Sequence, residues 1–568
     1  MKRFFIFTGI ALGCFAIGWL TYLAAAPALP PLSRYVPAGP LLYLEAKDFS
    51  TLLSDWNSSP QKKQWLTSDN YEVFSRSRLF LRLKGASEQF AAAAGLPPDM
   101  NLLSQVAGER SVFALYDIGN LQFLYITYLP SAKSMQTTLW QTRSKFEPRS
   151  AGGVDFYLRR DPQSHREVAF AVSGDYLLLS TREDLMAGAL QLMAGKQDRT
   201  VEGERWWAQS TAAAGQAGDL RMVLNLEDLV PNGYFRTYWV QQNITDLKRY
   251  SASVSDLFRS SKQYREERVL IKKDEPKQAS LPDGPAAAAE VARLVPGEAG
   301  VYEAEANPTS DASSALLETK LLAPHFGPVP PSQIAPQVQL TSGEQGGSSD
   351  LETRIDQTRV DHPIAQQSVP ALKELLDKTP LLASLQVQST APGQADVFVR
   401  IHSAVVLVAG SDWNQDAVQS ALTDFVRPGL TASQLGVGWQ QKTGYQELDG
   451  LWPLVASVRG KYLLVSDDPG LAEAILANFS HKSDRKPADL LAGFNHQQER
   501  NNFARFSNVV DRPSATVADA ETRRGEPQFF SSNMVSLSST LASVSAEKIE
   551  VRSEGNKERQ TVIYEWAQ

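Results

Sequence analysis

The sequence predicts an α+β fold made of two homologous halves, each a mainly antiparallel sheet with helices packed on it, after one N-terminal transmembrane helix. Short apolar runs joined by tight turns indicate β-hairpins, and these alternate with runs of helical periodicity. A repeated block indicates the duplication: SGDYLLLSTREDLMAGALQLM begins at Ser173, and RGKYLLVSDDPGLAEAILANF begins at Arg459. Each copy predicts a turn, a buried strand and an amphipathic helix.

Further matches extend the repeat along the chain. RYVPAGPLLYLEAK at Arg34 aligns with RLVPGEAGVYEAEA at Arg293 and pairs Tyr43 with Tyr302. The spacing between copies is larger at the later block, so the second half has an insertion, which we assign to a long loop at 327–370. The remaining matches pair Asn225 and Asp228 with Asn508 and Asp511, the string ASVS at Ala252 with that at Ala542, and Glu267-Arg268 with Glu558-Arg559. A repeat this long indicates duplicated domains rather than a solenoid.

These matches divide the chain into four parts. Residues 1–33 are an anchor and stalk, 34–273 the first half, 274–292 a linker rich in Pro and Ala, and 293–568 the second half.

Strands and helices follow from residue patterns along each half. Strands are expected at 41–46, 111–116, 121–129, 154–160, 167–172, 176–180, 220–226, 267–272, 383–388, 396–408 and 437–442, and in the second copy of the block. Helices are expected at 49–56, 60–95, 131–146, 235–258, 371–376 and 412–426. A helix after 176–180 should be capped by Thr181, with Asp184 three residues on.

The N-terminus predicts a membrane anchor. Lys2 and Arg3 precede an uncharged run at 4–26, which would span about 34 Å as a helix. The positive flank stays in the cytoplasm, so we expect a single-pass protein of the bacterial inner membrane with its bulk on the periplasmic side. Signal cleavage near Ala26-Pro27-Ala28 is the alternative; lipidation at Cys14 is disfavoured, because the apolar run before it is short.

Composition narrows the partners and cofactors. The net charge is −7, the pI is about 5.6, and no basic stripe is visible, so a nucleic-acid partner is not expected. Cys14 is the single cysteine, which excludes internal disulfides and cysteine-based metal sites.

A search for chemistry assigns no catalytic, cofactor-binding or metal residue and no cofactor. The six histidines show no HExxH spacing, and GxSxG and GxxxxGK[ST] motifs are absent. Asp467 and Asp468 fall at a helix start, where acids favour the helix dipole, with metal binding as the minor alternative. Glu303 and Glu305 share one strand face, which is more often solvated than a catalytic dyad, and His402 reads as a core or edge residue.

The eleven tryptophans, among them Trp206, Trp207, Trp439 and Trp452, could stack on sugars if exposed, although core packing is the simpler interpretation.

The run Val36–Glu45 (VPAGPLLYLE) and the block Gly174–Thr181 (GDYLLLST) resemble uncharacterised bacterial exported proteins of a domain family of unknown function. That resemblance implies an envelope location and no known reaction. We therefore expect a non-enzymatic envelope protein that binds or scaffolds an envelope protein partner. The alternatives are a binder of a hydrophobic or glycan ligand in a groove between the halves, and an enzyme with an unrecognised site.

Overall fold

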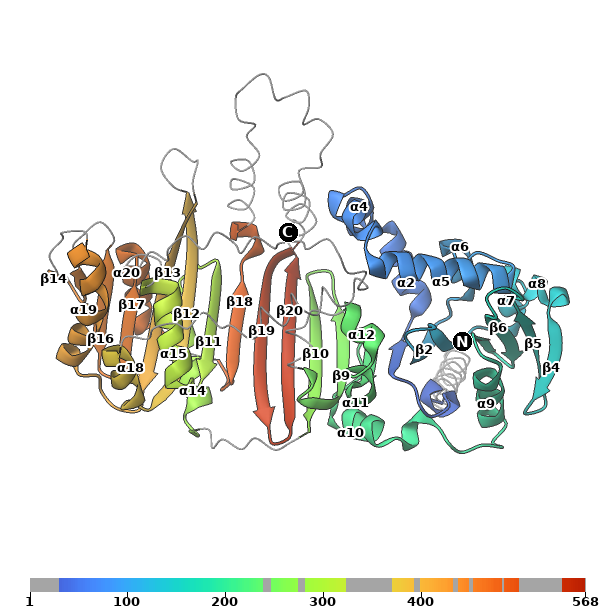
Figure 1. The fold of residues 1–568 in the computed structure, drawn as a ribbon. Helices are drawn as coiled ribbons and strands as arrows, with labels where there is room; N and C mark the ends of the chain where they lie inside the picture. The colour runs from blue at the N-terminus through green and yellow to red at the C-terminus, as the bar shows by residue number, and fades with distance from the viewer. Residues whose placement is uncertain are drawn as a thin grey trace, which may run out of the picture.

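The protein is an α+β structure with one large antiparallel sheet, seen in a computed structural model (Figure 1). The structure describes residues 30–238, 247–273, 281–322, 370–392, 399–432, 438–448, 453–482, 485–499 and 544–566. The predicted anchor at 4–26 and the predicted loop at 327–370, apart from its last residue, lie outside these ranges. No helix within them is long and apolar enough to cross a membrane.

The strands fall into two sets of ten, which we call the first segment (β1–β10) and the second segment (β11–β20). The first comprises β1 Leu42–Ala46, β2 Arg110–Asp117, β3 Gln122–Tyr128, β4 Glu147–Ala151, β5 Val154–Arg160, β6 Glu167–Ser173, β7 Tyr176–Ser180, β8 Leu220–Asn225, β9 Tyr250–Arg259 and β10 Gln263–Lys272. The second comprises β11 Val301–Ala306, β12 Leu381–Pro392, β13 Val399–Ala409, β14 Trp439–Gln441, β15 Gln446–Leu448, β16 Leu454–Arg459, β17 Tyr462–Ser466, β18 Leu490–Phe494, β19 Val544–Glu554 and β20 Lys557–Trp566.

The strand order has a centre at the pair β10–β20. From one edge the sheet reads β4-β5-β6-β7-β3-β2-β1-β8-β9-β10, and it continues as β20-β19-β18-β11-β12-β13-β17-β16-β15-β14. Each strand of the first segment thus has a counterpart at the same place on the other side of the centre. The two segments join edge to edge, so one sheet runs through the molecule (Figure 1).

Helices cover both faces of the first segment. Those of one layer precede β2 in the chain: α2 Phe49–Ser58, α3 Pro60–Leu66, α4 Asp69–Ser75, α5 Arg78–Ala94 and α6 Met100–Val106. Short helices follow at α7 Ser131–Ser134 and α8 Thr138–Gln141, and later ones at α9 Glu183–Met193, α10 Arg205–Ala213, α11 Leu226–Leu229 and α12 Gly233–Tyr238. In Figure 1, α5 and α6 lie on one side of β2 and its neighbours, and α9 lies on the other.

The second segment carries its own helices. They are α14 Gly284–Val291, α15 Ser310–Leu317, α18 Pro370–Asp377, α19 Gln415–Ala432 and α20 Pro469–Ala477. Buried residues of α14 and α20 belong to one core, and those of α15, α18 and α19 belong to another.

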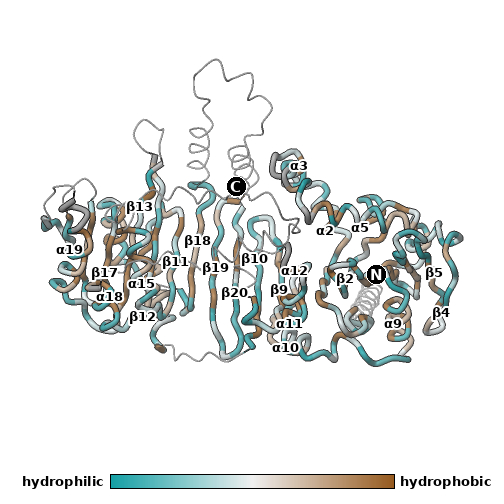
Figure 2. The backbone as a smooth tube through the Cα atoms, viewed as in Figure 1, coloured by the Kyte–Doolittle hydropathy of each residue, from teal (hydrophilic) through white to brown (hydrophobic). Residues whose placement is uncertain are grey.

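Alternation along the strands sends successive side chains into different cores. On β2, Val112 and Ala114 join the core that includes Met186 of α9, whereas Phe113 packs on the core that includes Leu102 of α6. The tube in Figure 2 accordingly shows hydrophobic and hydrophilic stretches mixed along many strands.

Several predicted elements have a different form. The single helix expected at 131–146 is broken into α7, α8 and a 3-10 turn, Arg143–Lys145. The C-terminal part of the helix expected at 235–258 is strand β9. This strand pairs with β8 and β10, and its first residues alternate between buried and half-buried positions. Part of the expected linker is helix α14, which buries Ala288 and Val291.

The helix α9 is not capped as predicted. Its N-cap is Arg182, which makes no capping side-chain bond. The Thr181 hydroxyl instead accepts a hydrogen bond from the Phe123 backbone N–H at 2.8 Å. Thr181 therefore ties β3 to the end of β7.

Candidate functional site

An apolar cavity lies in the first segment, between the sheet and the helical layer of α2, α5 and α6. Its volume is about 420 Å³, and its lining is overwhelmingly apolar. Ligand sites of proteins fall in this size range, and a predominantly apolar wall favours apolar ligands.

The floor of the cavity is a row of side chains across four adjacent strands. Leu44 lies opposite Phe113, Phe113 opposite Tyr125, and Tyr125 opposite Leu179. Directly opposed residues of an antiparallel sheet project from the same face. The floor is therefore fixed by strand register.

The roof comes from helices that follow β1 in the chain. Helix α5 contributes Leu83, Ala86, Ser87 and Phe90, whose spacing places them on one helical face. Small residues at the two middle positions leave space between helix and sheet. Apolar side chains of α6 close the next part of the wall.

Tyr125 is the polar group built into the floor. Its hydroxyl donates to the Val106 carbonyl at 2.8 Å and lies 3.2 Å from Ser111 Oγ. Burial raises the pKa of Tyr125 to about 12, so the phenol stays protonated at neutral pH. The bond joins the end of α6 to the sheet and holds roof and floor together.

Two arginines meet at one end of the cavity, beside the β2–β3 turn. Arg166 lines the cavity, donates through Nε to Gln89 Oε1 at 2.8 Å, and donates through Nη1 to the Asn120 carbonyl. Arg82 of α5 donates to the Gly119 carbonyl. Burial, and then the like charge of Arg82, lower the pKa of Arg166, while Asp117 acts in the opposite direction.

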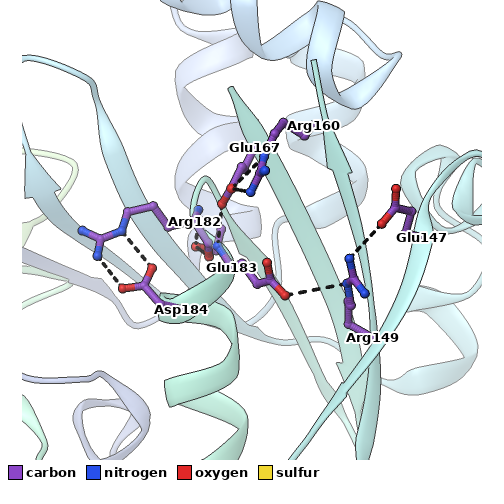
Figure 3. Close-up of polar contacts among 8 residues, drawn as sticks. Glu147, Arg149, Arg160, Glu167, Arg182, Glu183 and Asp184 are labelled. Carbon is purple, nitrogen blue, oxygen red and sulfur yellow. Dashed lines mark hydrogen bonds and ion pairs between the residues drawn. The ribbon is translucent and has the colours of Figure 1, made fainter. Parts of the chain in front are cut away.

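Glu167 is the carboxylate at this end, and it is fully engaged. One oxygen pairs with Arg160, and the other accepts the Glu183 backbone N–H at 2.9 Å. Figure 3 shows this pair near further ion pairs made by residues of β4 and of the start of α9. They are Arg182–Asp184, Glu183–Arg149 and Arg149–Glu147. Neighbouring opposite charges satisfy one another here, as in a structural surface network.

A second pocket, of about 750 Å³, lies where β10 meets the β19–β20 turn. It is lined by side chains of both signs, including Glu204, Asp228, Lys272 and Lys273, with Asn556 from the second segment. This junction pocket is polar, whereas the apolar cavity lies inside the first segment rather than in a groove between the segments.

The candidate residues of the second segment have structural roles. Asp468 caps α20 by accepting the Leu471 N–H at 2.7 Å, and Asp467 accepts the Ser403 N–H at 2.7 Å. His402 Nδ1 lies 3.4 Å from Asp468 Oδ1. Within the described ranges, no group of three or more His, Cys, Asp or Glu side chains could hold a metal ion.

Glu303 and Glu305 are both exposed on β11, as expected for a solvated strand face.

The paired tryptophans are part of a core. Trp206 and Trp207 are 7% and 8% exposed, and the Trp207 ring packs edge-on against Tyr43 at 4.5 Å. They offer no surface for stacking a sugar. Trp452 lies outside the described residues.

Sequence reasoning missed the cavity. The α5 spacing at residues 83, 86, 87 and 90 was visible, but the same pattern is typical of a filled core. No sequence motif marks Arg166, which is one of several charged residues before β6.

Comparisons with known proteins leave the function open. No family model matches the chain, and no curated protein matches it. Among solved structures, crystal forms I, IV and III of TP0453 are similar at 10–12% identity with a TM-score of 0.24. These matches cover 43–46% of this chain and 81–86% of that one. Likeness at this level carries no information about activity.

Proposed function

We propose that this protein is a non-enzymatic binding protein that holds an apolar ligand in the cavity of its first segment. The observation that supports this most directly is the apolar cavity of about 420 Å³. Protein cores pack to near-crystalline density, so an unfilled apolar space of this size is suited to holding an apolar ligand.

We also propose that the chain is an internal duplication of homologous halves. The mirrored strand order supports this, and so do matching details of the two block copies. Gly174 and Gly460 both turn their hairpins with positive φ, at 55° and 57°. Ser180 and Ser466 each accept the N–H, and donate to the carbonyl, of the residue two positions on.

The proposed duplication makes the cavity specific to one half. The second-segment row that corresponds to the cavity floor is Glu303, Gln386, Val405 and Val465, each opposite the next. A carboxylate and an amide there replace Leu44 and Phe113, so that face would not favour an apolar ligand. The apolar floor is thus a property of the first segment and not a by-product of the fold.

We place the binding domain outside the cytoplasm, held to the bacterial inner membrane by residues 4–26. Lys2 and Arg3 before the apolar run support this orientation. Fractionation with N-terminal sequencing tests it. A mature protein that begins near Leu29 and washes off membranes would contradict the anchor.

Photolabelling of the full chain in lipid nanodiscs tests ligand binding. The probe is 1-hexadecanol with a diazirine in its chain, and labelled peptides are mapped by mass spectrometry. Labels should fall on α5, α6 and the opposed strands. Ala86→Phe fills the cavity and should abolish this labelling.

Ala92→Phe is the matched control, because Ala92 is exposed on the same helix and does not line the cavity. It should label like the wild type. Labelling that is absent from the cavity, or equal in the two variants, would refute ligand binding there.

A second candidate function is docking of an envelope protein partner, which exposed apolar side chains support. Trp56, Leu66 and Leu81 are 47%, 46% and 56% exposed on helices α2, α3 and α5. Cross-linking in intact cells, compared between wild type and Leu66→Asp/Leu81→Asp, tests it. A partner that cross-links equally to both would exclude this surface.

A further inference from the structure

Arg166 lines one end of the cavity, and Arg82 lies near enough for its like charge to lower the pKa of Arg166. Within the described part of the chain, neither Arg82 nor Arg166 forms an ion pair, although most nearby arginines do. Arg166 Nη2 also has no hydrogen-bond partner there. A guanidinium with a free donor beside a second cation suits an anion, because charge-assisted hydrogen bonds to carboxylate or phosphate are strong.

The surrounding contacts fix both guanidinium groups. Gln89 and the Asn120 carbonyl hold Arg166, and the Gly119 carbonyl holds Arg82. The Tyr234 ring lies 5.6 Å from the Arg82 guanidinium carbon and completes the support. These groups are therefore pre-positioned and need little reordering on binding.

The backbone at this end of the cavity is also unusual. Leu121 follows Asn120, whose carbonyl Arg166 binds, and His165 precedes Arg166; their φ angles are 48° and 55°. A bulky residue with positive φ is an outlier that surrounding contacts must maintain. Leu121 itself lines the cavity.

We propose that the ligand is a single-chain amphiphile whose carboxylate or phosphate head is bound by Arg166 and Arg82 while its alkyl chain lies in the cavity. The proposal rests on the function proposed above and names the ligand class for the same site. The guanidinium fork matches carboxylate and phosphate geometry, and the apolar row from Leu44 to Leu179 suits a methylene chain.

Glu167 does not oppose this assignment, because Arg160 and the Glu183 N–H already satisfy its two oxygens. Asp117 is occupied by Asn120, whose N–H and side-chain amide donate to it at 3.1 and 3.0 Å. Asp117 therefore offsets part of the Arg166 charge from a distance, but among the described residues neither Asp117 nor Glu167 forms an ion pair with Arg82 or Arg166.

Competition against the photolabel tests the head group in the full chain. The competitors are palmitate, hexadecyl phosphate and 1-hexadecanol, and the measured quantity is how each variant changes their apparent affinities. Arg166→Gln should weaken palmitate and hexadecyl phosphate by about ten- to hundredfold and hexadecanol by less than about twofold. Arg82→Gln should act in the same direction and keeps the test valid if Arg166→Gln fails to fold.

Lys84→Gln is the matched control, since it removes a positive charge from α5 at an exposed position that does not line the cavity. It should leave all three affinities unchanged. Shortening the alkyl chain should weaken binding by about fourfold per methylene group. A stronger effect on palmitate identifies a carboxylate head, and a stronger effect on hexadecyl phosphate identifies a phosphate head.

Two results would overturn the head-group assignment while leaving apolar ligand binding intact. One is equal weakening of acid and alcohol in Arg166→Gln, and the other is an unchanged acid affinity in both arginine variants. Failure of every competitor to displace the label, together with no labelling in the cavity, would instead refute the proposed function itself.

Discussion

Replacing Tyr125 by Phe tests whether the cavity floor and roof are tied as the structure shows. The change removes the bond from the Tyr125 hydroxyl to the Val106 carbonyl at the end of α6. A buried carbonyl left without a donor costs about 1–3 kcal/mol of unfolding free energy. At neutral pH the variant should therefore be less stable than the wild type by at least about 1 kcal/mol.

Alkaline pH should reduce this advantage of the wild type. An unfolded tyrosine ionises near pH 10, whereas burial raises the pKa of Tyr125 to about 12 in the folded protein. Between these values the unfolded state has lost a proton that the folded state retains, so stability falls as pH rises. The loss attributable to Tyr125 is about 1.4 kcal/mol at pH 11, approaching twice that at pH 12. Phe cannot ionise, so the wild-type advantage should shrink by about 1.4 kcal/mol by pH 11, and the two stability curves cross by then if the advantage at pH 7 is no larger than that.

Urea unfolding followed by tryptophan fluorescence, from pH 7 to pH 11.5, measures both effects. Other tyrosines titrate in both proteins and cancel in the difference. Tyr128→Phe on the same strand is the matched control, because its hydroxyl has no hydrogen-bond partner within the described ranges. A wild-type advantage that stays constant up to pH 11.5 would show that Tyr125 is not the buried, bonded phenol described above.

Three further substitutions test packing and polar contacts. Asp256→Ala should lower the free energy of unfolding by about 3–5 kcal/mol, because the Arg221 guanidinium, which donates hydrogen bonds to Asp256 at 2.7 and 2.8 Å, would lose its partner. Replacing both residues by apolar ones should cost less, and a double-mutant cycle measures the difference. Asp468→Ala should cost about 0.5–2 kcal/mol in thermal or urea unfolding through loss of the α20 cap, and no change would refute the capping role. Gly108→Ala should destabilise by about 1–3 kcal/mol, since the new Cβ would lie 2.1 Å from the Tyr128 backbone carbonyl oxygen. An unchanged melting temperature would contradict that contact.

Much of the local structure could be predicted from patterns of period 2 and 3.6. The strand at 176–180 has the predicted bounds, and the hairpin strands predicted at 111–116 and 121–129 each differ by one residue at either end. Helix α3 begins at Pro60, where a helix was expected, and Ser59 caps it. Elements whose apolar pattern is decided by local sequence could therefore be predicted.

Errors arose where long-range pairing outweighed local propensity. The run from Tyr250 contains Ser and Asp that weaken a strand pattern, yet β9 lies between β8 and β10 and buries Asp256 by pairing it with Arg221. The mid-helix Gln136–Thr137 region breaks the helix expected at 131–146, because Thr137 caps a new helix by accepting the Trp140 N–H. The partners of β9 are distant in sequence and marked by no motif, whereas the Thr137 cap is a local signal that the helical pattern of the surrounding residues hid.

The cavity could not be predicted from the sequence. A hydrophobic pattern indicates which side chains face inward, but not whether those side chains fill the space between helix and sheet. Leu44 and Phe113 belong to the same apolar alternation as residues of a filled core, and Ala86 and Ser87 differ from filled positions only in size. The internal comparison offers the one usable signal: under the proposed duplication, Leu44 stands where the other copy has Glu303. Two copies under the same folding constraint need the same turns and buried strands, which is what the repeated block preserves. A position that is apolar in one copy and charged in the other is therefore not required by the fold that the copies share. Such positions are where a binding surface specific to one copy should be sought.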